Sequence, residues 1–124
     1  MSTALVIDDS RAMRLLVGST LASFGFQVLE AGNGAEALRV IEEEPLRLSL
    51  LTVDWNMPVL NGLQFVRQIR SDVRFRHIPI VMITSECQPA QIEEALETGV
   101  DEYIMKPFNQ DGLREKFALL GIGQ

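Results

Sequence analysis

The chain alternates five times between a short apolar run and a longer stretch of helical periodicity, and this alternation restricts its possible folds most strongly. The runs are almost entirely apolar, which is typical of strands that helices cover on both faces. We predict strands over these ranges: Ala4–Ile7, Gln27–Ala31, Leu48–Val53, Ile80–Ile83 and Tyr103–Met105.

Helices are predicted between and after these runs, where apolar residues recur every three or four positions. The predicted ranges are Arg11–Phe24, Ala35–Glu43, Leu63–Arg70, Pro89–Thr98 and Gly112–Leu120. Asn61 is a favourable cap for the third helix, and Pro45 should end the second. In the fourth helix we expect Ile92, Ala95 and Leu96 to face the core.

Regular strand–helix alternation predicts an α/β fold, with a parallel sheet and helices on both of its sides. The chain has 124 residues, 47% of them hydrophobic, which suits one domain with one core. We see no internal repeat or linker, so residues 1–124 are expected to form a single domain.

The charge balance and the termini exclude several classes of function. A net charge of −6 and a pI near 4.7 argue against nucleic acid as a partner, because an acidic surface repels phosphate. A single cysteine cannot form an internal disulfide. Neither a secretory signal nor a membrane-spanning apolar run is visible, so we expect a cytoplasmic protein without a membrane partner.

Polar residues follow the predicted strands at their carboxyl ends. They are Asp8, Asp9, Asp54, Thr84 and Lys106. In an open parallel sheet these ends line the crevice where ligands bind, so four strands should deliver carboxylates, a hydroxyl and an ammonium group to one rim. Taken singly, each residue has a plainer interpretation, such as a helix cap for the acidic pair or a surface position for the lysine.

Three neighbouring carboxylates repel one another and favour a divalent cation with oxygen ligands, which describes Mg²⁺. An aspartate beside such a metal can act as a nucleophile toward phosphorus. A lysine and the metal are then the usual stabilisers of the charge that develops on the transferring phosphoryl group. The rim therefore predicts phosphoryl transfer to an aspartate.

The motifs VIDDS, VDWNMPVLNGLQFVRQIR, PIVMITS and YIMKPF resemble the response-regulator receiver family in order and in spacing. The similarity extends over the whole chain and is greatest to stand-alone chemotaxis-type (CheY-like) regulators. It implies a flavodoxin-like, doubly wound sheet of order 2-1-3-4-5 with five helices. It also implies that residues 1–124 form one receiver domain.

The resemblance assigns roles to individual residues. It implies Asp54 as phosphoacceptor, Asp8, Asp9, Asp54 and the backbone carbonyl of Asn56 as Mg²⁺ ligands, Lys106 and Thr84 as catalytic groups, and Thr84 and Tyr103 as switch residues. Pro107 matches a proline that usually follows a cis peptide bond in the family. Two interpretations of Glu86 stand side by side: it influences how the attacking water reaches the phosphoryl group, or it is a solvated loop residue.

The family's donor is a phosphohistidine on a sensor histidine kinase or a histidine phosphotransfer protein. Phosphorylation is expected to change the face formed by the fourth helix, fifth strand and fifth helix, and a downstream protein that the sequence does not identify would bind this face. The chain would then catalyse only its own phosphorylation and dephosphorylation, and would not be an enzyme acting on other substrates. We expect a monomer.

Three alternatives stay open at this point. A phosphohydrolase of the haloacid-dehalogenase type needs a D-x-D motif, and Ser10 stands where its second aspartate should be. A flavodoxin-like cofactor binder needs a phosphate-binding loop after the first strand, where Asp8 and Asp9 would repel phosphate. A degenerate receiver would serve only as an interaction module, although every key position is filled.

Overall fold

The computed structural model describes residues 2–43 and 48–122, and it contains one parallel sheet of order β2-β1-β3-β4-β5. The strands are β1 (Thr3–Ile7), β2 (Gln27–Ala31), β3 (Leu48–Val53), β4 (Ile80–Thr84) and β5 (Glu102–Met105). The helices are α1 (Arg11–Ser23), α2 (Gly34–Glu43), α3 (Gly62–Ser71), α4 (Pro89–Thr98) and α5 (Gln110–Leu119). The doubly wound α/β fold and the sheet order predicted from the sequence are confirmed.

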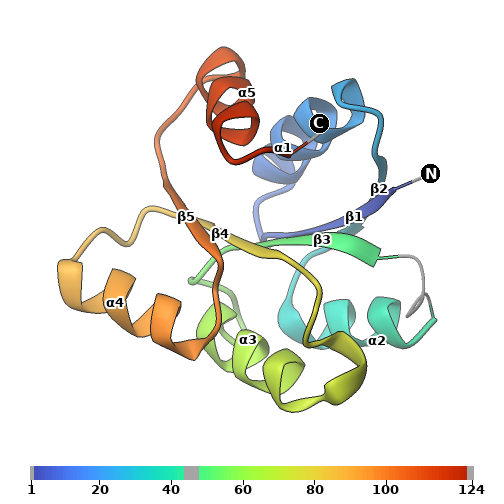
Figure 1. Ribbon diagram of the computed structural model, residues 1–124, viewed down its shortest axis with the longest axis vertical. Coiled ribbons are helices and arrows are strands. Elements are labelled where there is room, and N and C mark those ends of the chain that lie inside the picture. Colours follow the sequence, from blue (N-terminus) through green and yellow to red (C-terminus); the bar gives the residue numbers. More distant parts are fainter. Residues whose placement is uncertain (1, 44–47, 123–124) are drawn as a thin grey trace.

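Helices cover both faces of the sheet, with α1 and α5 on one side and α2, α3 and α4 on the other (Figure 1). Side chains of β1 alternate between these two layers. Leu5 and Ile7 join the core cluster under α2 and α3, whereas Ala4 and Val6 join the cluster under α1 and α5. A strand buried on both faces needs apolar side chains at every position, which explains the unbroken apolar runs.

Local signals set the helix ends as expected. The Asn61 side chain accepts from the backbone N–H of Gln64, and the Gln64 side chain accepts from the N–H of Asn61, which forms a capping box for α3. Gly99 ends α4 with a φ of 126°. Pro45, predicted to end α2, lies outside the described residues. No described helix has the length and apolar character required to cross a bilayer.

One local prediction is wrong, and one short element was not predicted. Leu96 was expected to face the core, but 46% of its surface is exposed. The inward stripe of α4 is narrow, since Ala95 is its one buried residue in the described chain and Ile92 is only half-buried. A short 3₁₀ helix at Val73–Phe75, which we did not predict, follows α3 and begins with Asp72 as its cap.

Arg70, in the last turn of α3, joins segments that are distant in sequence. Its Nε donates to the Gly99 carbonyl at 2.9 Å, and its Nη1 donates to the carbonyls of Arg76 and Ile78 at 2.9 and 2.8 Å. Its Nη2 bonds Asp101 Oδ2 at 2.9 Å. One guanidinium group therefore satisfies the carbonyls at the end of α4 and in the turn before β4.

Replacing Arg70 with Met should destabilise the protein by about 2–4 kcal/mol, because several charge-assisted hydrogen bonds are lost and their acceptors stay half-buried. Urea unfolding at neutral pH would measure this change. Arg67→Met is a matched control on the same helix, where the exposed side chain makes one long ion pair of 3.6 Å with Glu94. The control should change stability by no more than about 0.5 kcal/mol. Equal effects of the two substitutions would refute the structural role of Arg70.

Candidate functional site

The carboxylates predicted to meet at the strand ends do meet there. Strands β1 and β3 pair in parallel with Ile7 opposite Val53, so the residues that follow, Asp8 and Asp54, lie side by side. One carboxylate oxygen from each of Asp8, Asp9 and Asp54 lies within 4.8 Å of the others. Asp8 and Asp54 are buried and Asp9 is exposed, so the cluster opens toward solvent on one side.

Lys106 closes the cluster from the end of β5. Its Nζ donates to Asp8 Oδ2 at 2.9 Å and to Asp54 Oδ2 at 3.0 Å. Burial lowers the pKa of Lys106, but its hydrogen bonds and ion pairs with Asp8 and Asp54 more than offset this effect, so the net shift is upward. Lys106 is therefore charged at neutral pH and neutralises part of the carboxylate charge.

Lys106 does not fully compensate the cost of burying the Asp8 carboxylate. Burial raises the pKa of Asp8 above its usual value of 3.8, despite the hydrogen bonds that the carboxylate accepts from the Ser10 backbone N–H and from Lys106. The charge of Asp54 raises it further. The two partners of this ion pair therefore differ. At Lys106 the pairing outweighs the cost of burial and favours the charged ammonium group, whereas at Asp8 the cost of burial outweighs the pairing and disfavours the charged carboxylate.

The raised pKa of Asp8 predicts how the metal-free protein responds to pH. The folded state binds a proton at Asp8 more readily than the unfolded state does, so this contribution to stability is present below pH 3.8 and is lost as the pH rises through the folded-state pKa. Asp8→Asn should therefore raise the urea midpoint at neutral pH in EDTA, and the gain should shrink in acid. Asp111→Asn, in the exposed first turn of α5, is the control and should show neither effect.

A lower midpoint for Asp8→Asn at neutral pH would contradict this interpretation. It would mean that the pairing of Asp8 with Lys106 outweighs the burial of the carboxylate.

The loop between β3 and α3 approaches the site closely at Gly62. The backbone N–H of Gly62 donates to the Trp55 carbonyl at 2.8 Å. A Cβ atom at Gly62 would lie 2.2 Å from the Asp54 carbonyl oxygen, which is too close for any side chain. Within this loop Val59 has a φ of 71°, a strained conformation for a β-branched residue. The loop is therefore held tightly against the backbone of Asp54.

Gly62→Ala should destabilise the protein by about 2–3 kcal/mol, because the new methyl group forces the loop away from Asp54. Urea unfolding would measure the cost, and fluorescence of Trp55, the only tryptophan, would report movement beside the site. Gly112→Ala near the start of α5 is the control, where the nearest contact of a Cβ is a side-chain oxygen at 3.1 Å. The control should stay within about 1 kcal/mol of the wild type, since alanine favours a helix. Unchanged stability and fluorescence in Gly62→Ala would show that the loop is not constrained.

Glu86 connects the remaining predicted residues. The Asn56 side chain donates to Glu86 Oε1 at 2.6 Å, the Glu86 backbone N–H donates to Thr84 Oγ1 at 3.4 Å, and the Tyr103 hydroxyl donates to the Glu86 carbonyl at 2.6 Å. Thr84 is fully buried. The half-buried Tyr103 ring packs against the core, and burial, followed by the charges of Glu86 and Asp54, raises its pKa to about 12, so its hydroxyl stays protonated.

The structure thus brings Asp8, Asp9, Asp54 and Lys106 into one cluster. Thr84, Tyr103 and the Asn56 side chain are connected to one another through Glu86, and the Asn56 backbone N–H also donates to Asp54 Oδ1 at 3.3 Å. The Lys106–Pro107 peptide bond is cis, as the sequence led us to expect.

Arg14 is a neighbour of the site that the sequence did not reveal. Its Nη1 donates to the Asp8 carbonyl at 2.6 Å, and its Nε bonds Glu30 Oε1 on β2 at 3.0 Å. Arg14 therefore connects α1 to β2 and to the backbone of Asp8, one of the three residues of the acidic cluster. The one available signal was its position one turn inside α1, which does not distinguish this role from an exposed arginine.

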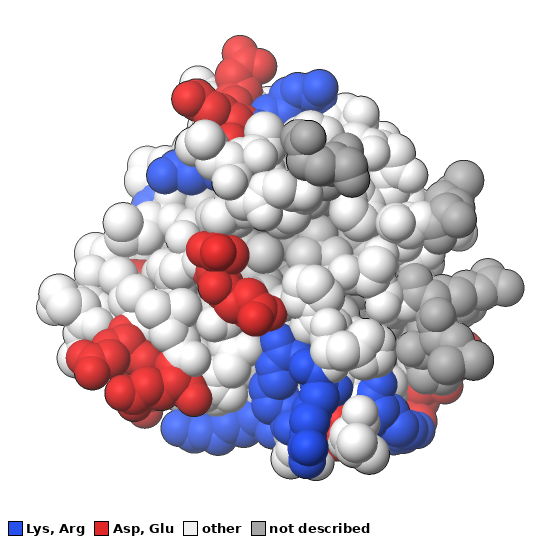
Figure 2. Space-filling view, viewed as in Figure 1, with Lys and Arg blue, Asp and Glu red and all other residues white. Residues whose placement is uncertain are grey.

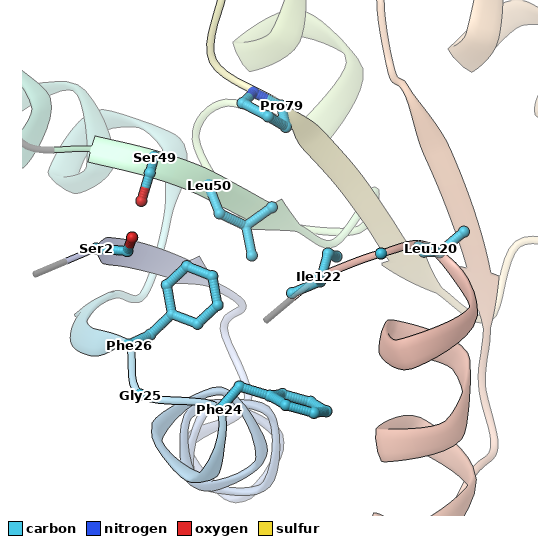
Figure 3. Close-up of a pocket in the computed structure, with 10 residues that line it drawn as sticks. Ser2, Phe24, Gly25, Phe26, Ser49, Leu50, Pro79, Leu120 and Ile122 are labelled. Atoms are coloured by element: carbon cyan, nitrogen blue, oxygen red, sulfur yellow. The ribbon is translucent and has the colours of Figure 1, made fainter. Parts of the chain in front are cut away.

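A separate cavity of about 450 Å³ lies at the opposite end of the strands (Figure 3). Its lining includes Ser2, Phe26 and Pro79, each of which precedes a strand, and Leu120 and Ile122 after α5. None of the residues that line it is charged. The cavity is therefore unrelated to the carboxylate cluster.

The donor set of the cluster fits a hard divalent cation. Three carboxylates supply oxygen ligands only, and the chain's one cysteine, Cys87, and one histidine, His77, are exposed and are not part of the group. A doubly wound sheet with carboxylates and a lysine at its carboxyl rim defines an α/β protein of receiver type.

Comparison with known proteins gives the family. The model of the response regulator receiver domain matches residues 4–118. The chain belongs to this family and is the receiver domain of a CheY-like response regulator of two-component signalling, which confirms the resemblance found in the sequence. The dehalogenase-type and flavodoxin-type alternatives are therefore set aside.

Individual relatives resemble the chain over nearly its full length. It is 45% identical over 117 residues to chemotaxis protein CheY1 of Helicobacter pylori, with 94% of each chain covered. It is 40% identical over 121 residues to a chemotaxis protein CheY homolog of Campylobacter jejuni, covering 96% of this chain and 92% of the relative. The structure of chemotaxis response regulator CheY4 of Vibrio cholerae is 32% identical, with a TM-score of 0.87 and coverage of 97% and 98%.

Proposed function

We propose that this chain is a Mg²⁺-dependent phosphorylation switch in which Asp54 accepts a phosphoryl group. The observation that carries the proposal is the contact of Lys106 Nζ with both Asp8 and Asp54 inside a group of three carboxylates. A nucleophile, a site for a divalent cation and a fixed positive charge are the parts that phosphoryl transfer requires.

In this proposal Asp8, Asp9, Asp54 and the backbone carbonyl of Asn56 hold the metal. Bound Mg²⁺ would supply charge stabilisation for the transferring phosphoryl group. The close carboxylates of Asp8 and Asp54 favour cation binding. Lys106 offsets their mutual repulsion only in part, and a divalent ion would relieve the remainder.

The transfer begins with a phosphohistidine on a sensor histidine kinase or a histidine phosphotransfer protein. A carboxylate oxygen of Asp54 forms a bond to phosphorus while the P–N bond breaks, and the electron pair of that bond returns to the imidazole. Lys106 stabilises the charge on the phosphoryl oxygens. Water later hydrolyses the acyl phosphate, so the chain acts on itself and on no separate substrate.

The switch uses Thr84 and Tyr103. The Thr84 hydroxyl would turn toward the phosphoryl group, and the backbone of Glu86 would follow, because Glu86 bonds both Thr84 and Tyr103. The Tyr103 ring already packs inward in the structure. In this proposal phosphorylation favours the inward packing of the Tyr103 ring.

We infer that residues 1–124 act as one receiver domain in the cytoplasm, as a monomer. The relatives named as chemotaxis proteins support a role in chemotaxis-type signalling. The output would be a change in the face formed by α4, β5 and α5, which a partner protein binds.

The proposal is tested by intact-mass analysis after incubation with acetyl phosphate, with and without Mg²⁺. We expect one added phosphoryl group on the wild type with Mg²⁺, and none without Mg²⁺ or in Asp54→Asn. Asp111→Asn is the control aspartate and should be phosphorylated like the wild type. An adduct that persists in Asp54→Asn would identify a different acceptor.

A second outcome would favour the degenerate receiver. If rapid quenching finds no Mg²⁺-dependent adduct while Trp55 fluorescence and urea unfolding show an intact fold, the chain is an interaction module and the proposed switch is wrong.

A further inference from the structure

The two acidic residues that follow β1 are held in different ways. The Asp8 carboxylate accepts from the Ser10 backbone N–H at 2.9 Å and from Lys106 Nζ at 2.9 Å. Asp9 is exposed, and no ion pair in the described part of the chain involves it, although one of its oxygens belongs to the carboxylate cluster. The position of the Asp9 carboxylate therefore depends mainly on the backbone that carries it.

The backbone of Asp8 is fixed on both of its sides. Its N–H donates to the Ala31 carbonyl at 3.1 Å, which continues the pairing of β1 with β2. Its carbonyl accepts from Arg14 Nη1 at 2.6 Å. This carbonyl and the Asp9 N–H belong to one planar peptide group. Arg14 therefore sets the orientation of the peptide group that joins the two acidic residues.

Arg14 is itself held from two directions. Its backbone N–H donates to the Ser10 carbonyl at 3.0 Å in the first turn of α1, and its Nε pairs with Glu30 Oε1 on β2 at 3.0 Å. The half-buried guanidinium group is planar and rigid, so the contact of Nε with Glu30 fixes the direction in which Nη1 points. That direction leads to the Asp8 carbonyl.

Glu30 also changes the electrostatic effect of Arg14 on the acidic cluster. An uncompensated guanidinium charge against the Asp8 backbone would repel a cation that approaches the carboxylates. The carboxylate of Glu30 lies 3.0 Å from Arg14 Nε, so the two opposite charges cancel at a distance. The pair thus supplies a hydrogen bond to the Asp8 carbonyl without adding net positive charge beside the cluster.

We propose that Arg14 is a positioning residue of the cation site, because it fixes the peptide group between Asp8 and Asp9. Glu30 cancels its charge, so that this support does not weaken cation binding. The inference rests on the proposed function for the identity of the cation, Mg²⁺. Without Arg14 the carboxylates are still present, but binding then includes the cost of ordering the peptide group that carries Asp9. Contacts that orient metal ligands commonly change metal affinity about 10–100-fold.

Titration of the full chain with Mg²⁺ alone, followed by the fluorescence of Trp55 next to Asp54, measures the affinity of the cation site. The main variant is the double replacement Arg14→Met/Glu30→Gln. It keeps the net charge of the wild type and removes the contact with the Asp8 carbonyl. We expect its Kd for Mg²⁺ to be about tenfold higher than that of the wild type, at low and at high salt alike.

Glu30→Gln alone tests the role of charge. The glutamine side chain still offers an oxygen to Arg14 Nε, but the guanidinium charge is no longer compensated. The Kd for Mg²⁺ should rise about threefold at low salt, and the difference from the wild type should fade at high salt, which screens the charge. This variant keeps the hydrogen bonds of Arg14, so it tests the proposal even if the double variant does not fold.

The positioning role also predicts how phosphorylation depends on Mg²⁺. With acetyl phosphate, the double variant should need about tenfold more Mg²⁺ for its half-maximal rate. Its rate at saturating Mg²⁺ should approach that of the wild type, because Asp54 and Lys106 are unchanged. A lower rate at saturation would assign Arg14 to the transfer step and overturn the positioning role.

A second arginine–glutamate pair, at the other end of the strands, gives the control. Figure 2 shows Lys and Arg side chains gathered along the lower edge of the view, in the region where Figure 1 shows α3. Arg74, between α3 and β4, pairs with Glu42 near the end of α2 at 2.8 Å. Arg74→Met/Glu42→Gln removes an ion pair of the same kind and should leave the Kd for Mg²⁺ within about twofold of the wild type.

An unchanged Kd in the double variant, or an equal rise in the control, would overturn the proposal. Absence of Mg²⁺ binding to the wild type would overturn it as well, because there would be no cation site to position. Intact-mass analysis of the same samples separates this failure from failure of the switch. Mg²⁺-dependent phosphorylation of Asp54 with an unchanged Kd in the double variant overturns the positioning role alone. The expected pattern of Kd values without any phosphorylation supports the positioning role and overturns only the proposed function.

Discussion

The structure depends most on the crowding of negative charge where β1 and β3 end side by side. Strands β1 and β3 pair in parallel with Ile7 opposite Val53, so the next residues, Asp8 and Asp54, must lie side by side. Lys106 offsets part of the repulsion between them, because its ammonium group contacts both carboxylates in a half-buried site. The residual cost is visible in the raised pKa of Asp8, and it gives a divalent cation a favourable place to bind.

The same rim is connected to the surface through a few hydrogen bonds. Glu86 bonds Asn56 near the carboxylates, Thr84 at the end of β4 and Tyr103 on β5. The helix that follows Glu86 is only lightly anchored, since Ala95 is the one buried residue of α4 in the described chain. A helix with so little buried surface can shift at low cost, which is what the proposed switch requires of α4.

The elements and the rim residues were accessible from the sequence, because both follow from local rules. Strands buried on two faces must be apolar throughout, and helices show their inward stripe every three or four residues. A polar residue directly after such a strand must lie at its carboxyl end, so the shared rim of Asp8, Asp54 and Lys106 follows once the sheet is parallel. Helical spacing failed at Leu96, because periodicity cannot tell how wide a stripe the neighbouring helices leave buried.

The sequence by itself therefore determined the fold class and which side chains would share the rim. Only the tertiary structure decided which of them touch, and which distant residues support them. Arg14 reaches the Asp8 carbonyl and Glu30, and Arg70 reaches Gly99 and Asp101, through contacts between segments that no local pattern links. Long flexible arginines can satisfy many alternative acceptors, so their partners are set by packing and not by spacing along the chain.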